Sequence, residues 1–339
     1  MAPTLPSRLG AATRTAARSR LWRTVLVMAL LLAGLGGWWL SAGGSPRGPR
    51  GEVRFATGVP SGVYDRYGQM LQEHVTRAMP GVRLALDGTA GSVENLERVI
   101  SGKDDFAIAT ADAVADYQGP EKGKLRAIAR LYDDYLQLIV PADSTVHRTA
   151  DLKGKRVGVG LRQSGVNLVT KRLLAAAGLD PDHDITPAPT GIVEAAQKLR
   201  DGELDAFFWS GGLPTSALTD LSARMAIRVV PLSDLAEALH RAEGGGTDAY
   251  RAATMPKGTY PDAQPSDAVA TVAVPNLLIT RADVADDLVE GMTKAVIDSR
   301  DQIGSKVHAA QLVDLRTAVY TDPLPLHTGA SRYYRSVKP

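Results

Sequence analysis

Hydrophobic residues in this chain form short apolar runs, which alternate with longer segments whose apolar positions recur every three or four residues. The runs at 53–56, 106–109 and 206–209 predict buried strands, because strands covered on both faces read as continuous apolar stretches. The segments at 92–100 and 193–200 predict helices. Strands alternating with helices are typical of parallel βαβ units, so we expect an α/β fold.

One such unit is present twice. The stretch 91–105 recurs at 191–205, with glycine, a Val-Glu pair, a second glycine and an aspartate at equal spacing. Upstream, the Ser-Gly-Val sequence at 61–63 recurs at 164–166. The duplication predicts two lobes of similar construction, with several helix N-termini around the groove between them. Such a groove is suited to a small, anionic molecule.

The remaining apolar segments indicate where the lobes meet. Residues 125–132 and 135–140 predict two strands, and residues 270–279 predict a buried strand that returns to the first lobe. The chain would then cross between the lobes on two strands, which suits hinge closure. The expected boundaries are 52–141 plus 269–339 for lobe I and 142–268 for lobe II.

The first fifty residues differ from the rest, because they carry seven arginines and no acidic side chain. Residues 24–46 are uncharged and long enough, as a helix, to cross a hydrocarbon core. Most of the arginines precede this stretch, so we expect a cytoplasmic N-terminus and a body outside the membrane. The expected segments are 1–23, a basic cytoplasmic segment; 24–42, a transmembrane anchor; and 43–51, a linker. The alternative is a cleaved signal sequence and a secreted protein.

Composition excludes several kinds of protein. The chain has no cysteine, which excludes a disulfide framework, a thiolate metal site and a cysteine nucleophile. Residues 51–339 carry a net charge of −5, so no nucleic-acid partner is expected. The histidines have no metal-ligand spacing, and the Gly-Val-Gly sequence ending at Gly160 lacks the third glycine of a dinucleotide site. We expect no metal and no cofactor.

Seven motifs follow one another in order between Val53 and Arg335. They are at 56–64, 91–96, 125–129, 151–157, 205–215, 271–276 and 325–334. Together they resemble the TAXI family of TRAP-transporter solute receptors. The resemblance implies a bilobed periplasmic-binding-protein type II fold that captures a small solute outside the cytoplasmic membrane. It also implies delivery of that solute to a permease driven by an ion gradient.

The chain departs from the family pattern in two loops. Tyr64-Asp65-Arg66 stands where a Tyr-Tyr-Pro run is common, and residues 161–165 replace a common Pro-Gly-Ser-Gly sequence. Both loops are expected to meet the ligand, so the resemblance does not carry over the ligand's identity.

The expected cleft is lined by the loops that follow the strands. Glycines in these loops let the backbone approach a ligand closely, and free N–H groups at helix starts bind a carboxylate without a dedicated cation. The candidate ligand-binding residues are Thr57, Gly58, Ser61, Gly62, Val63, Tyr64, Gly91, Ser92, Thr110, Asp112, Arg162, Ser164, Gly165, Val166, Asn167, Trp209 and Gly211.

Four of these side chains have specific expected roles. Tyr64 and Trp209 would form walls of the pocket, and Arg162 would pair with a ligand carboxylate. Asp112 would either accept from a ligand amino group or simply begin a helix. The serines in the same loops are equally explained as helix N-caps.

We therefore expect a membrane-tethered receptor on the outer face of the cytoplasmic membrane. It would close on a small carboxylate, of the amino-acid or dicarboxylate type, and deliver it to a TRAP-type permease. An enzyme on the same scaffold is disfavoured, because the sequence has no Gly-x-Ser-x-Gly elbow and no paired histidines. A tethered sensor acting on a signalling partner stays an alternative that the sequence does not separate from the receptor.

Overall fold

The computed structural model describes residues 27–33, 48–241, 246–260, 262–264 and 267–337. The chain divides into two units, Met1–Gly48 and Pro49–Pro339. In the first unit residues 27–33 are helical, while the rest of the predicted anchor and the basic segment before it lie outside the described residues. Within the described ranges, no helix has the length and apolar character needed to cross a membrane.

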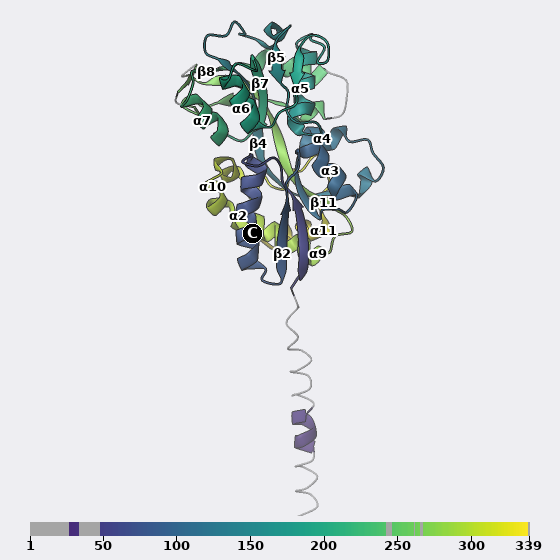
Figure 1. Cartoon of the computed structure of the whole chain (residues 1–339). Coiled ribbons are helices and arrows are strands. Elements are labelled where there is room, and N and C mark those ends of the chain that lie inside the picture. The colour runs from purple at the N-terminus through teal and green to yellow at the C-terminus, as the bar shows by residue number, and fades with distance from the viewer. Residues whose placement is uncertain (1–26, 34–47, 242–245, 261, 265–266, 338–339) are drawn as a thin grey trace, which may run out of the picture. The chain divides into compact units, whose positions relative to one another are not determined.

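The second unit consists of two α/β lobes (Figure 1). Elements at both ends of this unit form lobe I, which contains β1 (Gly51–Ala56), α2 (Val63–Ala78), β2 (Val82–Asp87), α3 (Ser92–Ile100), β3 (Phe106–Thr110), α4 (Ala111–Asp116), η1 (Lys122–Lys124), α9 (Asp286–Asp298), α10 (Arg300–Gly304), η5 (His308–Leu312) and α11 (Thr328–Val337).

Lobe II is formed by the middle of the chain. It contains η2 (Thr149–Leu152), β5 (Arg156–Gly158), α5 (Gly165–Ala176), β6 (Thr186–Ala188), α6 (Ile192–Arg200), β7 (Ala206–Gly211), α7 (Ser216–Ser222), β8 (Ile227–Val230), η3 (Ser233–Leu235), α8 (Ala236–Arg241), η4 (Thr247–Ala249), β9 (Arg251–Met255) and β10 (Ala263–Gln264).

Two long strands, β4 (Leu125–Pro141) and β11 (Val269–Arg281), belong to both lobes. The strand order is β2-β1-β3-β11-β4 in lobe I and β6-β5-β7-β4-β8 in lobe II. In each lobe three parallel strands are followed by a long antiparallel strand, which is β11 in one and β4 in the other. The two sheets are therefore built alike, and the predicted α/β fold is confirmed.

The sequence predicts two strands where the structure has the single strand β4. Asp133 and Asp134 interrupt the apolar pattern, but the backbone stays extended because both residues pair with β11, opposite Pro275 and Val274. Beyond this point β4 leaves lobe I and pairs with β7 and β8. The change of sheet thus falls near Asp134, inside the strand, and the lobe boundaries expected from the sequence stay a prediction.

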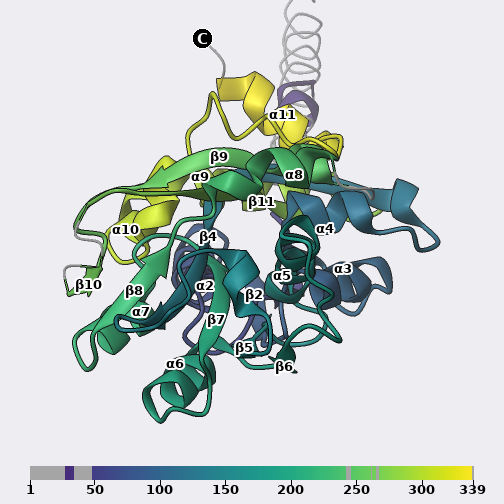
Figure 2. The ribbon, with the colours of Figure 1, turned by 90° about the horizontal axis from the view of Figure 1, so that it is seen from above.

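Each lobe has an apolar core on both faces of its sheet. In lobe I one core gathers around Phe55 and Met292, and the other around Leu96 and Leu277. In lobe II, α5 and α6 cover opposite faces of β7 (Figure 2). Strands buried on both sides in this way explain the continuous apolar runs of the sequence.

The repeated aspartates have the same structural role in the two lobes. Asp105 accepts a hydrogen bond from the backbone N–H of Arg54 at 2.9 Å, and Asp205 accepts one from the backbone N–H of Arg156 at 2.8 Å. Each aspartate therefore ties the start of one strand to its parallel neighbour. The two aspartates therefore share a structural role as well as a position in the repeated sequence.

Two other segments differ from the sequence-based expectation. The amphipathic pattern of residues 283–303 predicts a single helix, whereas the structure has two, α9 and α10, which meet at Ser299. The glycine-rich segment at 238–260 has weak strand signals, yet it contains β9, because β9 pairs with the first half of β11. Hydrogen bonding to β11 therefore stabilises β9 as a strand, although its own sequence has a weak strand pattern.

Candidate functional site

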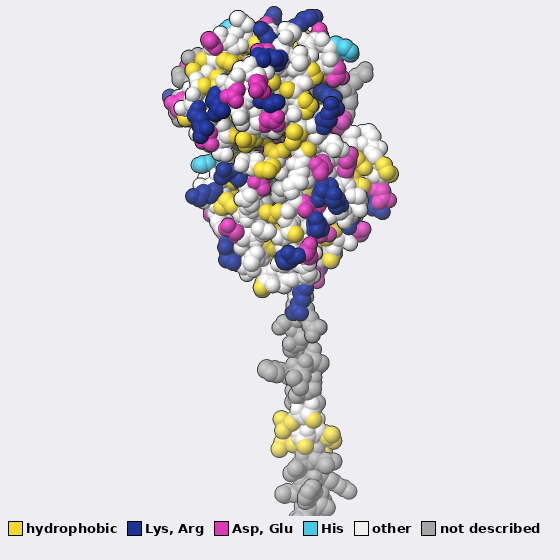
Figure 3. Space-filling view, viewed as in Figure 1, with side chains coloured by type: hydrophobic (Ala, Val, Ile, Leu, Met, Phe, Trp, Pro, Cys, Tyr) yellow, Lys and Arg dark blue, Asp and Glu magenta, His cyan; other side chains and the backbone are white. Residues whose placement is uncertain are grey.

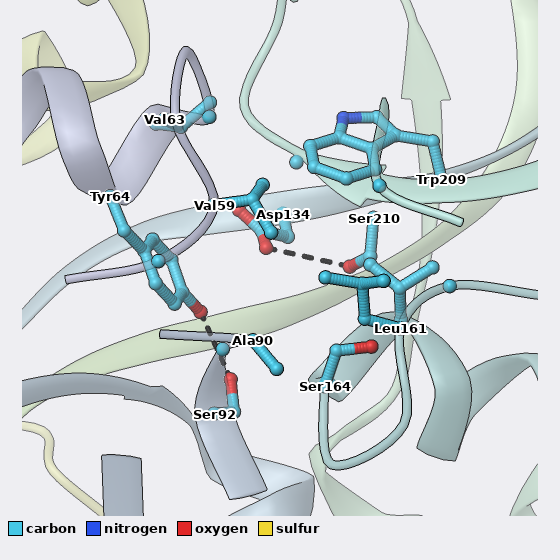
Figure 4. Close-up of a pocket in the computed structure, with 18 of the residues that line it drawn as sticks. Val59, Val63, Tyr64, Ala90, Ser92, Asp134, Leu161, Ser164, Trp209 and Ser210 are labelled. Carbon is cyan, nitrogen blue, oxygen red and sulfur yellow. Dashed lines mark hydrogen bonds between the residues drawn. The ribbon is translucent and has the colours of Figure 1, made fainter. Parts of the chain in front are cut away.

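A cavity lies between the two lobes, at the ends of the parallel strands. Its empty volume is about 550 Å³, including solvent at its mouth, and residues of both lobes line it. Hydrophobic side chains gather in the groove between the lobes on the face shown in Figure 3. Among the pockets of the described residues, this one combines main-chain turns from both lobes with buried polar side chains (Figure 4).

Four helices of nine or more residues, two from each lobe, begin at the cavity, and the short helix α4 also begins there, after Thr110. Helices α2 and α3 follow Gly62 and Gly91, and α5 and α6 follow Ser164 and Gly191. The three glycines have no side chain with which to cap the first turn. Ser164 does cap α5, since its Oγ accepts from the backbone N–H of Asn167 at 3.0 Å. The cavity thus collects the partial positive charge of four helix N-termini.

The lobes approach one another closely at glycines. A Cβ atom added to Gly165 would lie 2.9 Å from Ser92 Oγ and 3.2 Å from Thr110 Oγ1. Gly91 has φ +131°, a conformation that L side chains rarely adopt. Close by, the N–H of Glu94 in lobe I donates to the carbonyl of Gln163 in lobe II at 3.0 Å. The lobes therefore meet main chain to main chain beside the cavity.

Arg172 provides a second contact between the lobes. From α5 it donates to Asp116 Oδ1 at 2.7 Å and to Asp112 Oδ2 at 3.5 Å, both in α4. The Tyr250 hydroxyl donates to the same Asp112 oxygen at 2.6 Å. This cluster holds α4 of lobe I against α5 of lobe II.

Asn95 joins two loops of the lobe I wall to strand β3. Its Nδ2 donates to the carbonyl of Thr57 at 2.6 Å and to the carbonyl of Ile108 at 2.7 Å. Its Oδ1 accepts from Thr89 Oγ1 at 2.6 Å. Because Asn95 is fully buried, these bonds fix the turns that follow β1 and β2 relative to strand β3.

Tyr64 and Ser92 form a polar edge of the cavity in lobe I. The Tyr64 hydroxyl donates to Asn276 Oδ1 and lies 3.2 Å from Ser92 Oγ. Ser92 Oγ also accepts from the backbone N–H of Thr110 at 3.1 Å. Burial, assisted by the charge of Asp134, raises the pKa of Tyr64, so its hydroxyl keeps its proton. Tyr64 is therefore a hydrogen-bonding group and not an anion.

Asp134 lies at the centre of the cavity, between Tyr64 and Trp209 in Figure 4. Its side chain is 3% exposed, and its Oδ2 accepts from Ser210 Oγ at 3.4 Å. Burial raises the pKa of Asp134 to about 7. That pKa already includes smaller contributions, because the charges of Asp133 and Asp112 add to the rise and the polar groups of Asn276 and Ser210 oppose it.

Three buried polar atoms around the cavity have no hydrogen-bond partner in the structure: Asp134 Oδ1, Thr110 Oγ1 and Asn276 Nδ2. Although Asn276 lies close enough to favour the charged form of Asp134, no hydrogen bond joins their side chains. Unsatisfied buried polar atoms are few in native proteins, and each costs about 1–3 kcal/mol. Asp134 and Thr110 line the cavity, so a molecule bound there can complete their hydrogen bonds.

The opposite wall of the cavity is apolar. Trp209 is 8% exposed, and its Nε1–H donates to Thr215 Oγ1 at 3.1 Å, so the indole has its polar atom satisfied outside the cavity. Val59 and Leu161 add aliphatic surface beside it (Figure 4). A flat ring and branched side chains of this kind accommodate the apolar part of a ligand.

No lysine, arginine or histidine is among the residues that line this cavity. Arg162, which the sequence suggests as a carboxylate partner, is exposed and does not contribute to the lining. An anionic group bound here would meet helix N-termini and hydroxyl groups only.

Twelve of the seventeen candidate residues line the cavity: Gly58, Gly62, Val63, Tyr64, Gly91, Ser92, Thr110, Ser164, Gly165, Val166, Trp209 and Gly211. The other five do not. Thr57 is buried beneath the first loop, Ser61 and Arg162 are exposed, Asn167 donates to the Val159 carbonyl, and Asp112 belongs to the Arg172 cluster.

Of the three candidate serines, only Ser164 is an N-cap. Ser61 has φ +63° and precedes the N-cap of α2, while Ser92 uses its hydroxyl to join the ends of α3 and β3. The plain capping explanation therefore holds for one of them.

Eight further residues complete the lining: Val59, Ala90, Asp134, Gly160, Leu161, Thr190, Gly191 and Ser210. Six of them fall within the loops that the sequence predicts to line the cleft, which are 57–64, 89–92 and 110–112 in lobe I and 161–167, 190–193 and 209–212 in lobe II. Asp134 and Gly160 lie outside those loops, in or beside strands. Two adjacent aspartates between apolar runs are the signal that marks Asp134, although the same signal reads more simply as a turn.

Comparison with known proteins identifies the family. The model of the NMT1-like family matches residues 55–337, so the chain belongs to this family.

Solved structures of similar shape have low sequence identity. The periplasmic aliphatic sulphonate binding protein SsuA from Escherichia coli is 16% identical, with a TM-score of 0.45 over 86% of this chain and 84% of that one. A putative L-cystine ABC transporter protein from Listeria monocytogenes is 16% identical, with a TM-score of 0.47 over 78% and 98%. An ancestral arginine-binding protein bound to arginine is 16% identical, with a TM-score of 0.48 over 76% and 98%.

Proposed function

We propose that this member of the NMT1-like family is an extracytoplasmic solute-binding receptor, which captures a small carboxylate of the amino-acid or dicarboxylate type between its lobes. The observation that carries the proposal is the cavity itself. Helix N-termini from both lobes meet there, around buried polar atoms that have no partner within the protein.

A carboxylate fits the turns of this cavity. The first-turn N–H groups of α2, α3 and α6 follow glycine N-caps, so no side chain of the cap competes for them. Such N–H groups bind anions through hydrogen bonds and through the helix dipole, each contributing about 0.3–1 kcal/mol. The apolar wall at Trp209 would hold the rest of the solute.

Hinge closure supports selective capture and release. Among the described elements, β4 and β11 are the strands that extend from one lobe into the other, so the lobes can rotate about these two strands while each core stays packed. The lobe boundaries proposed above follow the same division. Closure places a ligand against both lobes at once, and opening exposes it to a membrane partner.

The proposed partner is a TRAP-type secondary transporter, on the basis of the seven TAXI-like motifs. The proposed location is the outer face of the cytoplasmic membrane, with residues 24–42 as the anchor or as a cleaved signal. Binding without chemistry is favoured over catalysis, because the sequence has no Gly-x-Ser-x-Gly elbow and no paired histidines, and the cavity lining has no histidine.

A ligand screen tests the proposal. The chain is titrated with amino acids and with mono- and dicarboxylic acids, and its melting temperature is followed, because ligands that bind only the folded state must raise it. Small-angle scattering with and without each hit then reports closure. The proposal predicts that at least one compound raises the melting temperature. With that compound bound, the radius of gyration should match that of the structure, in which the lobes are in contact. A screen in which no compound raises the melting temperature would contradict it.

A further inference from the structure

We propose, building on the receptor function above, that the ligand presents an ammonium group to the buried carboxyl group of Asp134, which has no cationic partner among the described residues. The ligand is therefore of the amino-acid class and not a dicarboxylate. Asp134 is the residue that makes this distinction.

Asp134 has acceptor capacity that the protein does not use. An ionised carboxylate has about four acceptor positions. Oδ1 has no partner, and Oδ2 has only the long 3.4 Å contact with Ser210. The side chain lines the cavity, so a donor on the ligand can reach these oxygens.

The neighbouring acids already have cationic partners, and Asp134 does not. Asp133, the next residue of β4, binds Arg130 at 2.7 Å and Arg251 at 3.1 Å. Asp112 of α4 binds Arg172 at 3.5 Å. Among the ion pairs of the described residues, none involves Asp134, which is the acid that lines the cavity.

Every other group facing Asp134 is neutral or acidic. Tyr64 faces it from α2, Ser210 from β7 and Asn276 from β11, and Tyr132 lies two residues away on β4. Asp133 and Asp112 add negative potential. A cation is thus the missing component of this site, since a charged carboxylate is rarely buried without one.

The two ends of the proposed ligand face groups of opposite character. Its ammonium would lie at Asp134, and its carboxylate at the glycine-capped helix starts, where the helix dipoles are positive. A dicarboxylate would bring a second anion against Asp134. That arrangement requires the carboxyl group to keep its proton, so it predicts the opposite dependence on pH.

Proton displacement follows from the burial of Asp134. With its pKa raised to about 7, the empty receptor is largely protonated at this position in mildly acidic solution. An ammonium ligand binds the ionised form, so affinity should rise as pH rises towards 7 and then level off. Between about pH 5.5 and about pH 8 the gain is roughly 30-fold.

Isothermal titration calorimetry on the full chain tests the inference. The probes are the standard amino acids, and for each one that binds, the acid that lacks its amino group; succinate and glutarate represent the dicarboxylates. Titrations at both pH values, in two buffers of different ionisation enthalpy, give the affinity and the number of protons released. We expect an amino acid to bind with release of up to one proton in mildly acidic buffer, and its deaminated acid to bind at least tenfold more weakly.

Two variants separate charge from structure. Asp134→Asn keeps the size of the side chain but removes its charge, and should abolish both proton release and the preference for the amino compound. Asp133→Asn is the matched control at the next position of β4, and should retain both. If Asp134→Asn keeps the preference and the proton release, the inference is wrong.

The alternatives have distinct outcomes. Acids that bind as tightly as their amino counterparts, or with proton uptake, would overturn the inference and leave the receptor function standing. A screen in which no amino acid and no acid binds would overturn both.

Discussion

Replacing Asp134 with asparagine should stabilise the ligand-free protein at neutral and alkaline pH. The folded-state pKa of Asp134, about 7, lies above its ordinary value of 3.8. The folded protein therefore binds this proton more tightly than the unfolded chain does. Stability is lost as the pH rises from about 4 to about 7, and the loss is complete above that range. Asparagine has no proton to lose and removes this dependence.

The expected magnitude follows from the pKa difference. About three pKa units at ~1.4 kcal/mol each give a penalty of about 4 kcal/mol at pH 8, and of only about 1.5 kcal/mol at pH 5. The stability of the variant relative to the wild type should therefore increase by about 2.5 kcal/mol between these two pH values. Any cost of the buried amide itself cancels in this comparison, because it is present at both.

Urea unfolding followed by circular dichroism at the two pH values measures the effect. Asp133→Asn serves as the control, since it removes an acid at the next position whose charge is already paired with Arg130 and Arg251. That variant should not reproduce the trend. If the wild type and Asp134→Asn show the same change in unfolding free energy from pH 5 to pH 8, the carboxyl group is not buried as described.

Three other substitutions test the closed cleft and its scaffold. Gly165→Ala should weaken ligand binding at least tenfold, because the new Cβ would lie 2.9 Å from Ser92 Oγ. Gly123→Ala is the control and should not weaken binding, because no atom lies within 4 Å of the Cβ added there. Equal calorimetric affinities for Gly165→Ala and the wild type would contradict the contact. Arg172→Met should increase the radius of gyration of the ligand-free protein in small-angle scattering, because the ion pairs between α4 and α5 are lost. An unchanged radius of gyration would show that these ion pairs do not hold the lobes together. Asn95→Leu removes the amide that donates to two buried carbonyls and should cost about 2–6 kcal/mol of unfolding free energy in urea, at about 1–3 kcal/mol for each lost bond. A loss below about 1 kcal/mol would contradict its role.

Much of the architecture was accessible from the sequence because it is encoded locally. The predicted helix at 92–100 has the bounds of α3, and the repeated glycines at 102 and 202 both adopt positive φ after a helix. Such signals depend on residues a few positions apart. They also placed most of the cavity lining, since loops between parallel strands and helices converge at one edge of a sheet.

The features that the sequence did not reveal depend on distant partners. Asp133 and Asp134 suggested a break in the strand, whereas pairing with β11, more than a hundred residues later, keeps β4 continuous and buries Asp134. Asp112 was a candidate ligand contact, but Arg172 and Tyr250, 60 and 138 residues away, engage it. A local sequence pattern does not indicate which acidic side chain forms an ion pair with a distant arginine.

The fluorescence of Trp209 tests the central claim, that a small solute binds between the lobes, most directly. The chain has four tryptophans, and Trp22→Phe, Trp38→Phe and Trp39→Phe leave Trp209, in the cavity wall, as the only one. Titration with a compound that raises the melting temperature should change its emission saturably, with the dissociation constant found by calorimetry, and Gly165→Ala should shift both alike. Binding that leaves Trp209 emission unchanged and is indifferent to Gly165→Ala would place the ligand elsewhere.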